Sequence, residues 1–137
     1  MSISLDRIFE TGVSWQDRQH RELFEKVVLL VLAVERGGGK EEVLELVSFL
    51  DEYVVVHFHD EEQAMHSCRY PDALAHMREH TGFIEDLSRL KEELKGGITT
   101  HLVGEVRERI ESWLINHTGV SDRKLGAFLL KKAVSPV

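Results

Sequence analysis

Residues 43–65 read VLELVSFLDEYVVVHFHDEEQAM, and the spacing of apolar residues in this stretch decides the fold. The apolar side chains recur every three or four residues, which is the period of one face of an α-helix and not the period of two expected of a strand. The resulting stripe consists of Val43, Leu46, Val47, Leu50, Val54, His57, Glu61 and Met65. It predicts a long amphipathic helix that carries a histidine and a glutamate on its buried face.

Three further stretches have the same helical period. One stripe comprises His20, Leu23, Phe24, Val27, Val31 and Val34. Another comprises His76, Met77, His80, Phe83, Ile84, Leu87, Leu90 and Leu94, and the last comprises Val103, Val106, Ile110, Trp113, Leu114 and His117. The valine-rich run in the first of these stretches is also compatible with a buried strand, but a helical period over about 20 residues is too long for one.

Short breaks separate the four predicted helices. They are Gly37-Gly38-Gly39, Tyr70-Pro71 and Gly96-Gly97. Long helices joined by short loops pack against their neighbours in the sequence in antiparallel fashion. We therefore expect an all-α fold, an up-down-up-down antiparallel four-helix bundle, in a single domain over residues 1–137. An irregular N-terminal arm is expected at 1–14, the helical bundle at 15–130 and a tail at 131–137.

The composition excludes several classes of partner. The chain has 137 residues, about one domain, and 17 basic against 24 acidic residues give a net charge of −7. Because no basic stripe occurs, a nucleic-acid partner is not expected. The longest apolar run, 27–34, is far shorter than the roughly 20 residues that span a membrane. The absence of a signal-peptide core near the start and the single cysteine, Cys68, make a cytoplasmic location the expectation.

The chain contains eight histidines, of which five lie on the apolar stripes: His20, His57, His76, His80 and His117. A lone histidine on an apolar face is more often a buried residue with ordinary hydrogen-bond partners than a metal ligand. Five of them, spread over all four stripes, are explained more simply by a shared metal site. The other three, His59, His66 and His101, lie about 160–200° away around their helices and are expected in solvent.

Two carboxylates complete the set of candidate ligands. Glu61 follows His57 by four residues and therefore shares its helix face. Asp122 follows His117 by five residues, about 140° away on a regular helix. The apolar stripe shifts by one residue at the same place, so we expect a one-residue π-bulge that turns Asp122 inward. The alternative is that the helix ends near Gly119 and Asp122 caps a following turn.

These residues resemble those of the hemerythrin family, and more closely those of the bacterial hemerythrins. The motifs are HFHDEE at 57–62, HMREH at 76–80 and WLINH at 113–117, and the resemblance runs from about residue 12 to 125. It includes all seven positions that ligate a pair of irons in that family, His20, His57, Glu61, His76, His80, His117 and Asp122.

The resemblance implies how these seven residues divide between two iron ions. His76, His80 and His117 would bind one iron, and His20 and His57 would bind the other. Glu61 and Asp122 would bridge the two irons together with an oxo or hydroxo group. The two-histidine iron then keeps one open position, at which dioxygen binds and leaves reversibly.

Reversible dioxygen binding implies an oxygen carrier, store or delivery protein and not an enzyme. The alternatives are an oxygen- or redox-sensing domain with a signalling partner, and a peroxide-handling di-iron enzyme. The chain length and starting Met favour a carrier or store if the chain is a whole gene product. Ferritin-like proteins and di-iron oxygenases use Glu-x-x-His, and many zinc hydrolases use His-Glu-x-x-His; neither motif occurs in the sequence.

Other residues near the candidate ligands allow two interpretations. Trp113, Leu114, Phe83 and Met65 are expected to wall an apolar dioxygen pocket, although ordinary core packing explains them equally well. Thr118 stands where hemerythrins usually carry Ile. Its hydroxyl either lies beside bound dioxygen or bonds back to the carbonyl of Leu114.

Three residues close to the motifs have weaker signals. Tyr53, one helical turn before His57, is a candidate hydrogen-bond donor to the site. Glu62 is expected in solvent. Cys68 is expected to be an incidental thiol just past the second helix.

Overall fold

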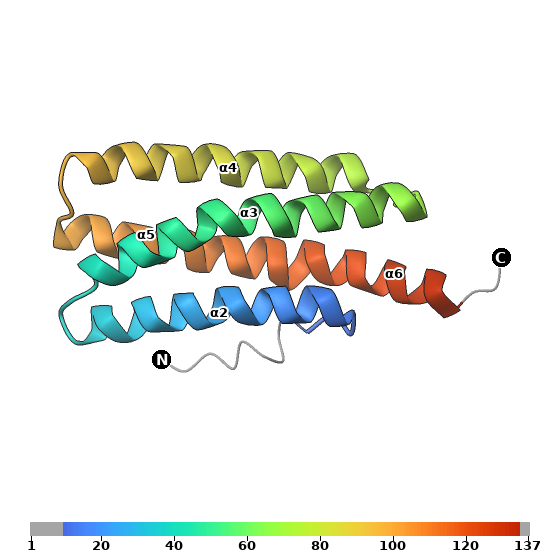
Figure 1. The fold of residues 1–137 in the computed structure, drawn as a ribbon, viewed down its shortest axis with the longest axis horizontal. Coiled ribbons are helices and arrows are strands. Elements are labelled where there is room, and N and C mark those ends of the chain that lie inside the picture. The colour runs from blue at the N-terminus through green and yellow to red at the C-terminus, as the bar shows by residue number, and fades with distance from the viewer. Residues whose placement is uncertain (1–9, 135–137) are drawn as a thin grey trace.

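A computed structural model describes residues 10–134 of the chain as four helical rods (Figure 1). The first three are α2 (Ser14–Glu35), α3 (Lys40–Cys68) and α4 (Ala73–Lys95). The fourth is continuous but has three parts, α5 (Thr100–Trp113), the π-helix η1 (Leu114–Asp122) and α6 (Arg123–Val134). Successive rods run in opposite directions, and no strand occurs in the described range. The predicted all-α, up-down-up-down bundle is confirmed.

The rods form a four-sided array in which chain neighbours are also neighbours in space. α3 packs against α2 and α4, and α5 closes the array by packing against both α2 and α4. The predicted breaks coincide with the observed ends of the helices. At the end of α2, Gly37 has a φ of +83°, and the N–H of Gly38 donates to the carbonyl of Ala33 at 2.9 Å. This left-handed turn ends the helix and reverses the chain.

The N-terminal arm and the C-terminal tail differ in part from the expected boundaries. Residues 1–9 of the arm and 135–137 of the tail lie outside the described part of the chain. Asp17 accepts hydrogen bonds from the N–H of Thr11 at 2.8 Å and of Gly12 at 3.1 Å, which fixes the arm against the first turn of α2. α6 continues to Val134, past the predicted end at 130, because Lys131 and Lys132 are good helix formers.

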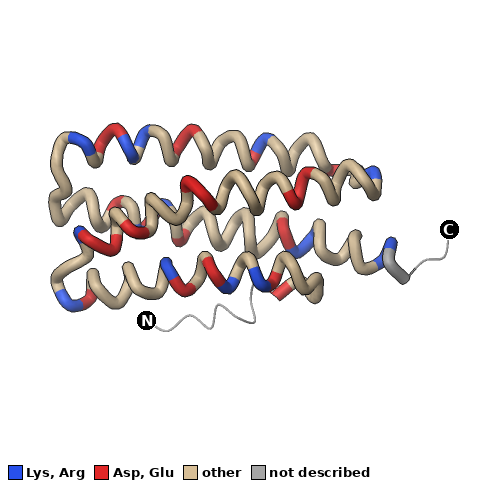
Figure 2. Tube along the Cα trace, viewed as in Figure 1, with Lys and Arg blue, Asp and Glu red and all other residues tan. Residues whose placement is uncertain are grey.

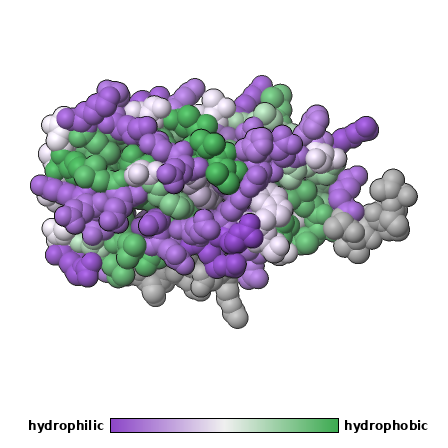
Figure 3. Space-filling model, in the orientation of Figure 1, coloured by the Kyte–Doolittle hydropathy of each residue, from purple (hydrophilic) through white to green (hydrophobic). Residues whose placement is uncertain are grey.

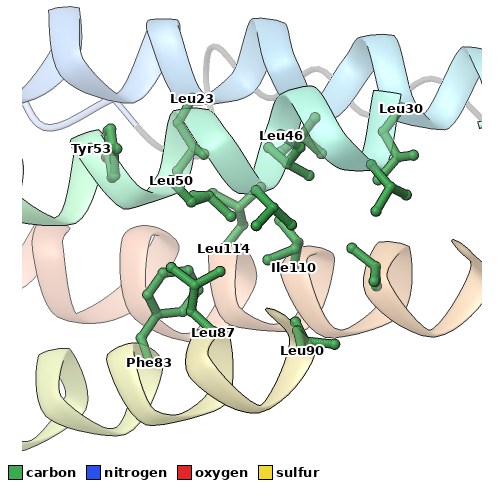
Figure 4. Close-up of a cluster of buried hydrophobic side chains, with 14 of the residues drawn as sticks. Leu23, Leu30, Leu46, Leu50, Tyr53, Phe83, Leu87, Leu90, Ile110 and Leu114 are labelled. Carbon is green, nitrogen blue, oxygen red and sulfur yellow. The ribbon is translucent and has the colours of Figure 1, made fainter. Parts of the chain in front are cut away.

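The hydrophobic core fills the half of the bundle nearest the α2–α3 and α4–α5 connections. Side chains from all four rods meet there, among them Leu30, Leu46, Leu90 and Ile110 (Figure 4). The prediction that Met77 and Ile84 face this core was wrong, because their side chains are 41% and 44% exposed. The buried face of α4 is the narrow stripe of residues 76, 80, 83, 87 and 90, and Met77 and Ile84 lie about 100° away on its flank.

The surface of the bundle is mixed in character. Lys and Arg residues are interspersed with Asp and Glu along the helices (Figure 2). Several apolar side chains also reach solvent (Figure 3), including Leu44, Val55 and Val120. Within the described residues, none of the helices combines the length and apolar character needed to span a membrane.

Candidate metal centre

The five inward histidines meet inside the bundle, with at least one contributed by each rod. His20 comes from α2, His57 from α3, His76 and His80 from α4, and His117 from η1. All five are at least 97% buried. The three remaining histidines, His59, His66 and His101, are exposed, as predicted. Helical period alone therefore separated inward from outward histidines correctly.

The histidines direct the same ring atom, Nε2, toward two carboxylates at the centre. Glu61 and Asp122 are fully buried. Nε2 of His76 lies 2.9 Å from Glu61 Oε1 and 3.1 Å from Asp122 Oδ1. Nε2 of His80 lies 2.9 Å from the same Glu61 oxygen, and Nε2 of His117 lies 3.1 Å from the same Asp122 oxygen.

The second oxygen of each carboxylate faces the remaining two histidines. Glu61 Oε2 lies 3.1 Å from Nε2 of His57, and Asp122 Oδ2 lies 2.9 Å from Nε2 of His20. Each carboxylate thus has one oxygen toward a three-histidine group and the other toward a two-histidine group. With this division, each carboxylate could contact one cation on the three-histidine side and another on the two-histidine side.

The π-helix η1 brings Asp122 into the centre. It spans nine residues, Leu114–Asp122, and both His117 and Asp122 lie on its buried side. A π-helix closes its hydrogen bonds from i to i−5, so residues five apart align as residues four apart do in an α-helix. The predicted bulge between His117 and Asp122 is confirmed, and the alternative of a helix ending near Gly119 is wrong.

The two carboxylates make the site strongly favourable for positive charge. Burial by itself lowers the pKa of His57, but Glu61 and Asp122 outweigh it and raise the pKa to about 10. Burial also lowers the pKa of His76 and of His117, but Asp122 and Glu61 outweigh it and raise both values to about 9. Burial would raise the pKa of both carboxyl groups, yet the surrounding imidazoles hold each below its usual range.

The donor atoms fit metal ions better than they fit one another. Nε2 of His57, Nε2 of His117 and Oδ1 of Asp122 are buried, and none has a hydrogen-bond partner among the described residues, although oppositely charged atoms lie close by. Buried polar atoms without partners are costly, and converging lone pairs at this distance suit a cation. The ligand atoms form two overlapping groups, each within 4.8 Å: Glu61, His76, His80, His117 and Asp122; and His20, His57, Glu61 and Asp122.

Several residues around the site form hydrogen bonds with the candidate ligands, and the sequence analysis did not predict most of these bonds. Gln16 on α2 donates from Nε2 to Glu61 Oε2 at 3.1 Å. Glu62 accepts a hydrogen bond from His80 Nδ1 at 3.0 Å while its side chain stays 37% exposed, so the prediction that it lies in solvent was only partly right. Glu79 does the same for His117 Nδ1 at 2.7 Å. Helical period does not predict these bonds, because the residues lie beside the apolar stripes and bond to side chains on other helices.

The residues expected to wall a dioxygen pocket are divided between the two hydrophobic clusters of the bundle. Trp113 stacks on His117 with ring centroids 4.6 Å apart, and Phe83 packs on Trp113 at 4.1 Å, so both lie beside the three-histidine group. Leu114 belongs to the main core beneath the site (Figure 4), and Met65 packs in a smaller cluster that includes Leu125.

The two-histidine group has different aromatic neighbours. Phe24 lies 6.0 Å from His20, and Tyr53 stacks on His57 at 4.7 Å, both measured between ring centroids. The hydroxyl of Tyr53 is buried without a hydrogen-bond partner among the described residues, and burial together with Asp122 and Glu61 raises its pKa. Cys68, a half-buried free thiol, is the last residue of α3.

The hydroxyl of Thr118 is buried next to the ligands. The residue is fully buried in η1, immediately after His117. Its Oγ1 has no hydrogen-bond partner in the described part of the chain, so it does not bond back to the carbonyl of Leu114. The bond-back alternative for Thr118 is therefore wrong.

Fold and site together define a four-helix-bundle protein with a buried histidine and carboxylate cluster that can hold metal ions. The sequence matches the family described as Hemerythrin HHE cation binding domain over residues 11–129. The chain therefore belongs to the hemerythrin family, a di-iron, oxygen-binding family, as the sequence motifs implied.

Individual relatives support the same assignment. A protein named Bacteriohemerythrin from Methylococcus capsulatus is 30% identical over 121 residues, which cover 88% of this chain and 91% of the relative. Bacteriohemerythrin from Stenotrophomonas maltophilia is 29% identical over 112 residues, or 82% of this chain and 71% of the relative. A Hemerythrin-like protein from Naegleria gruberi is 28% identical over 120 residues, 87% of each chain.

Proposed function

We propose that this protein binds dioxygen reversibly at a pair of irons and serves as an oxygen carrier, store or delivery protein. The observation that carries the proposal is the division of each carboxylate between two groups of histidines. Glu61 and Asp122 each present one oxygen to the three-histidine group and the other to the two-histidine group. That donor set suits two ions of unequal coordination.

The residues that would hold the irons are His76, His80 and His117 for one, His20 and His57 for the other, and Glu61 and Asp122 for both. When bound, an iron pair with one open position supplies two electrons that can be shared with dioxygen and recovered when it leaves. Nitrogen donors dominate this set, whereas ferritin-like di-iron sites are rich in carboxylates.

The chain's own residues contribute enclosure and position. The five histidines are almost fully buried, so bulk water has little access to the site. Phe24 and Tyr53 cover the two-histidine side, where the proposal puts dioxygen. Exclusion of water and protons slows side reactions that would make binding irreversible. We also propose a cytoplasmic location, which rests on the single cysteine in the sequence.

The test is anaerobic reduction of iron-loaded protein, followed by exposure to oxygen. Reversible binding predicts a visible charge-transfer band that appears under oxygen and disappears under argon over repeated cycles. Continuous oxygen consumption with turnover of an added reductant would instead support an oxidase. Metal analysis of the same sample is expected to give close to two irons per chain; a value near one, or zinc in place of iron, would contradict the proposal.

A further inference from the structure

Three of the five candidate histidine ligands bond through their outer nitrogen, Nδ1, to a residue on the preceding helix. Gln19 on α2 accepts from His57 Nδ1 on α3. Glu62 on α3 accepts from His80 Nδ1 on α4, and Glu79 on α4 accepts from His117 Nδ1 on η1. Each supporting residue directly precedes or follows a candidate ligand in the chain. Each accepts a hydrogen bond from a histidine on the next helix.

No residue of η1 forms the corresponding hydrogen bond to His20 on α2. His20 Nδ1 is buried, and no hydrogen-bond partner for it occurs among residues 10–134. Support is therefore graded between the two groups. In the three-histidine group, Nδ1 of His80 and of His117 each donates to a carboxylate, and His76 has no Nδ1 hydrogen bond to a described residue. In the two-histidine group, Nδ1 of His57 donates to the neutral amide of Gln19, and Nδ1 of His20 has no partner among the described residues.

The orientation of each supporting group is itself fixed. Gln19 donates from Nε2 to Asp60 Oδ2 at 2.7 Å, which leaves its carbonyl oxygen to face His57. Glu79 also accepts from Ser121 Oγ at 2.7 Å, in addition to its bond from His117 Nδ1. Two hydrogen bonds from η1 therefore hold the Glu79 carboxyl group in place.

We infer that Glu79 and Glu62 are positioning residues that make the three-histidine position bind its metal more tightly than the two-histidine position. A carboxylate behind an imidazole fixes the proton on Nδ1, keeps the Nε2 lone pair on the metal and makes that nitrogen a stronger donor. This inference rests on the proposed ligand set. It predicts ordered loading, in which the three-histidine position fills first and the two-histidine position loses its metal first.

The size of the effect follows from the exposure of the two carboxylates. Removal of such an outer partner elsewhere typically weakens metal binding by about 10- to 100-fold. Glu62 and Glu79 are 37% and 43% exposed, so water screens their charge. We therefore expect about a 10-fold effect from each, at the lower end of that range.

The experiment is anaerobic titration of the metal-free protein with Co²⁺ alone, followed by visible absorption and competition with a chelator. Wild type is expected to show two binding steps, and His20→Ala is expected to remove only the weaker one. Glu79→Gln keeps an oxygen that can accept from His117 and Ser121 but removes the charge. It is expected to weaken the tighter step about 10-fold with the weaker step little changed, and Glu62→Gln is expected to act in the same direction.

The matched control is Glu85→Gln, which removes the same charge from an exposed position of α4 that makes no hydrogen bond to a candidate ligand. It is expected to keep both steps as in wild type. Circular dichroism of each variant establishes that the bundle is folded. Equal shifts of both steps in Glu79→Gln, no shift at all, or the same shift in Glu85→Gln would overturn the inference.

The titration also separates this inference from the proposed function. Two equal cobalt steps, with reversible oxygen binding by the iron protein, would overturn the inference alone. Graded cobalt steps with no oxygen-dependent band would overturn the function and leave the inference standing. A wild-type protein that binds no cobalt would overturn both.

Discussion

We expect replacement of Gly126 by alanine to disturb the contact between α6 and the N-terminal arm, and through it the metal centre. Gly126 is buried in α6, and a Cβ placed on it would lie 2.6 Å from Thr11 Cβ and 2.9 Å from Gln16 Oε1. The Gln16 amide is flexible at its end, but Thr11 Cβ can retreat only if the arm moves. The same amide donates to Glu61, so the displacement reaches a candidate ligand.

The magnitude follows from two opposed effects. Alanine is more favourable than glycine inside a helix by about 0.8–1.0 kcal/mol. Forcing extra atoms into a packed site costs about 1–3 kcal/mol. The net change for Gly126→Ala is then a loss of about 0–2 kcal/mol in the free energy of unfolding. Gly82→Ala in α4 is the matched control, because its Cβ would meet no atom within 4 Å, and it is expected to gain about 1 kcal/mol.

The assay is equilibrium unfolding of both variants in urea, with the metal removed. Because the two variants share the gain in helix propensity, the difference between them isolates the steric cost, about 1–3 kcal/mol. Iron content after reconstitution gives a second measurement, and it is expected to fall in Gly126→Ala but not in Gly82→Ala. Equal stabilisation of the two variants would refute the close contact between α6 and the arm.

Three further predictions concern the ligands and their surroundings. His80→Ala is expected to lose metal, measured by metal analysis, because it leaves its group with two of three histidines; two irons retained would exclude His80 as a ligand. Thr118→Ile is expected to slow the decay of the oxygenated form, followed optically at fixed pH and anion concentration, because it removes a buried hydroxyl without a partner that can donate a proton or hold water; equal rates would mean that the hydroxyl is silent. The metal-free protein is expected to lose stability as pH rises from about 6.5 toward 9–10. The raised pKa values of His57, His76 and His117 stabilise the fold below the unfolded-state value and no longer do so above the folded-state values, at up to about 1.4 kcal/mol per pH unit for each proton. Urea midpoints that stay constant over this range would contradict it.

The sequence by itself determined the four helices, their order and the residues that face inward at the site. Helical period is a local property, so it places His57 and Glu61 on one face whatever the neighbouring helices do. Even the π-helix was visible, because the apolar stripe shifts by one residue between His117 and Asp122. Helical period and the resemblance to the hemerythrin family together identified the seven candidate ligands, whereas the structure decided that the helix continues through Gly119 to Asp122.

The tertiary structure alone decided which atoms meet and how wide each buried face is. Met77 and Ile84 are exposed because only a narrow stripe of α4 packs against the neighbouring helices, and helical period does not fix the width of that stripe. The supporting contacts of Gln19, Glu62 and Glu79 join neighbouring helices. No spacing within one helix encodes such contacts, because the relative rotation and axial offset of packed helices come from side-chain packing along their whole length.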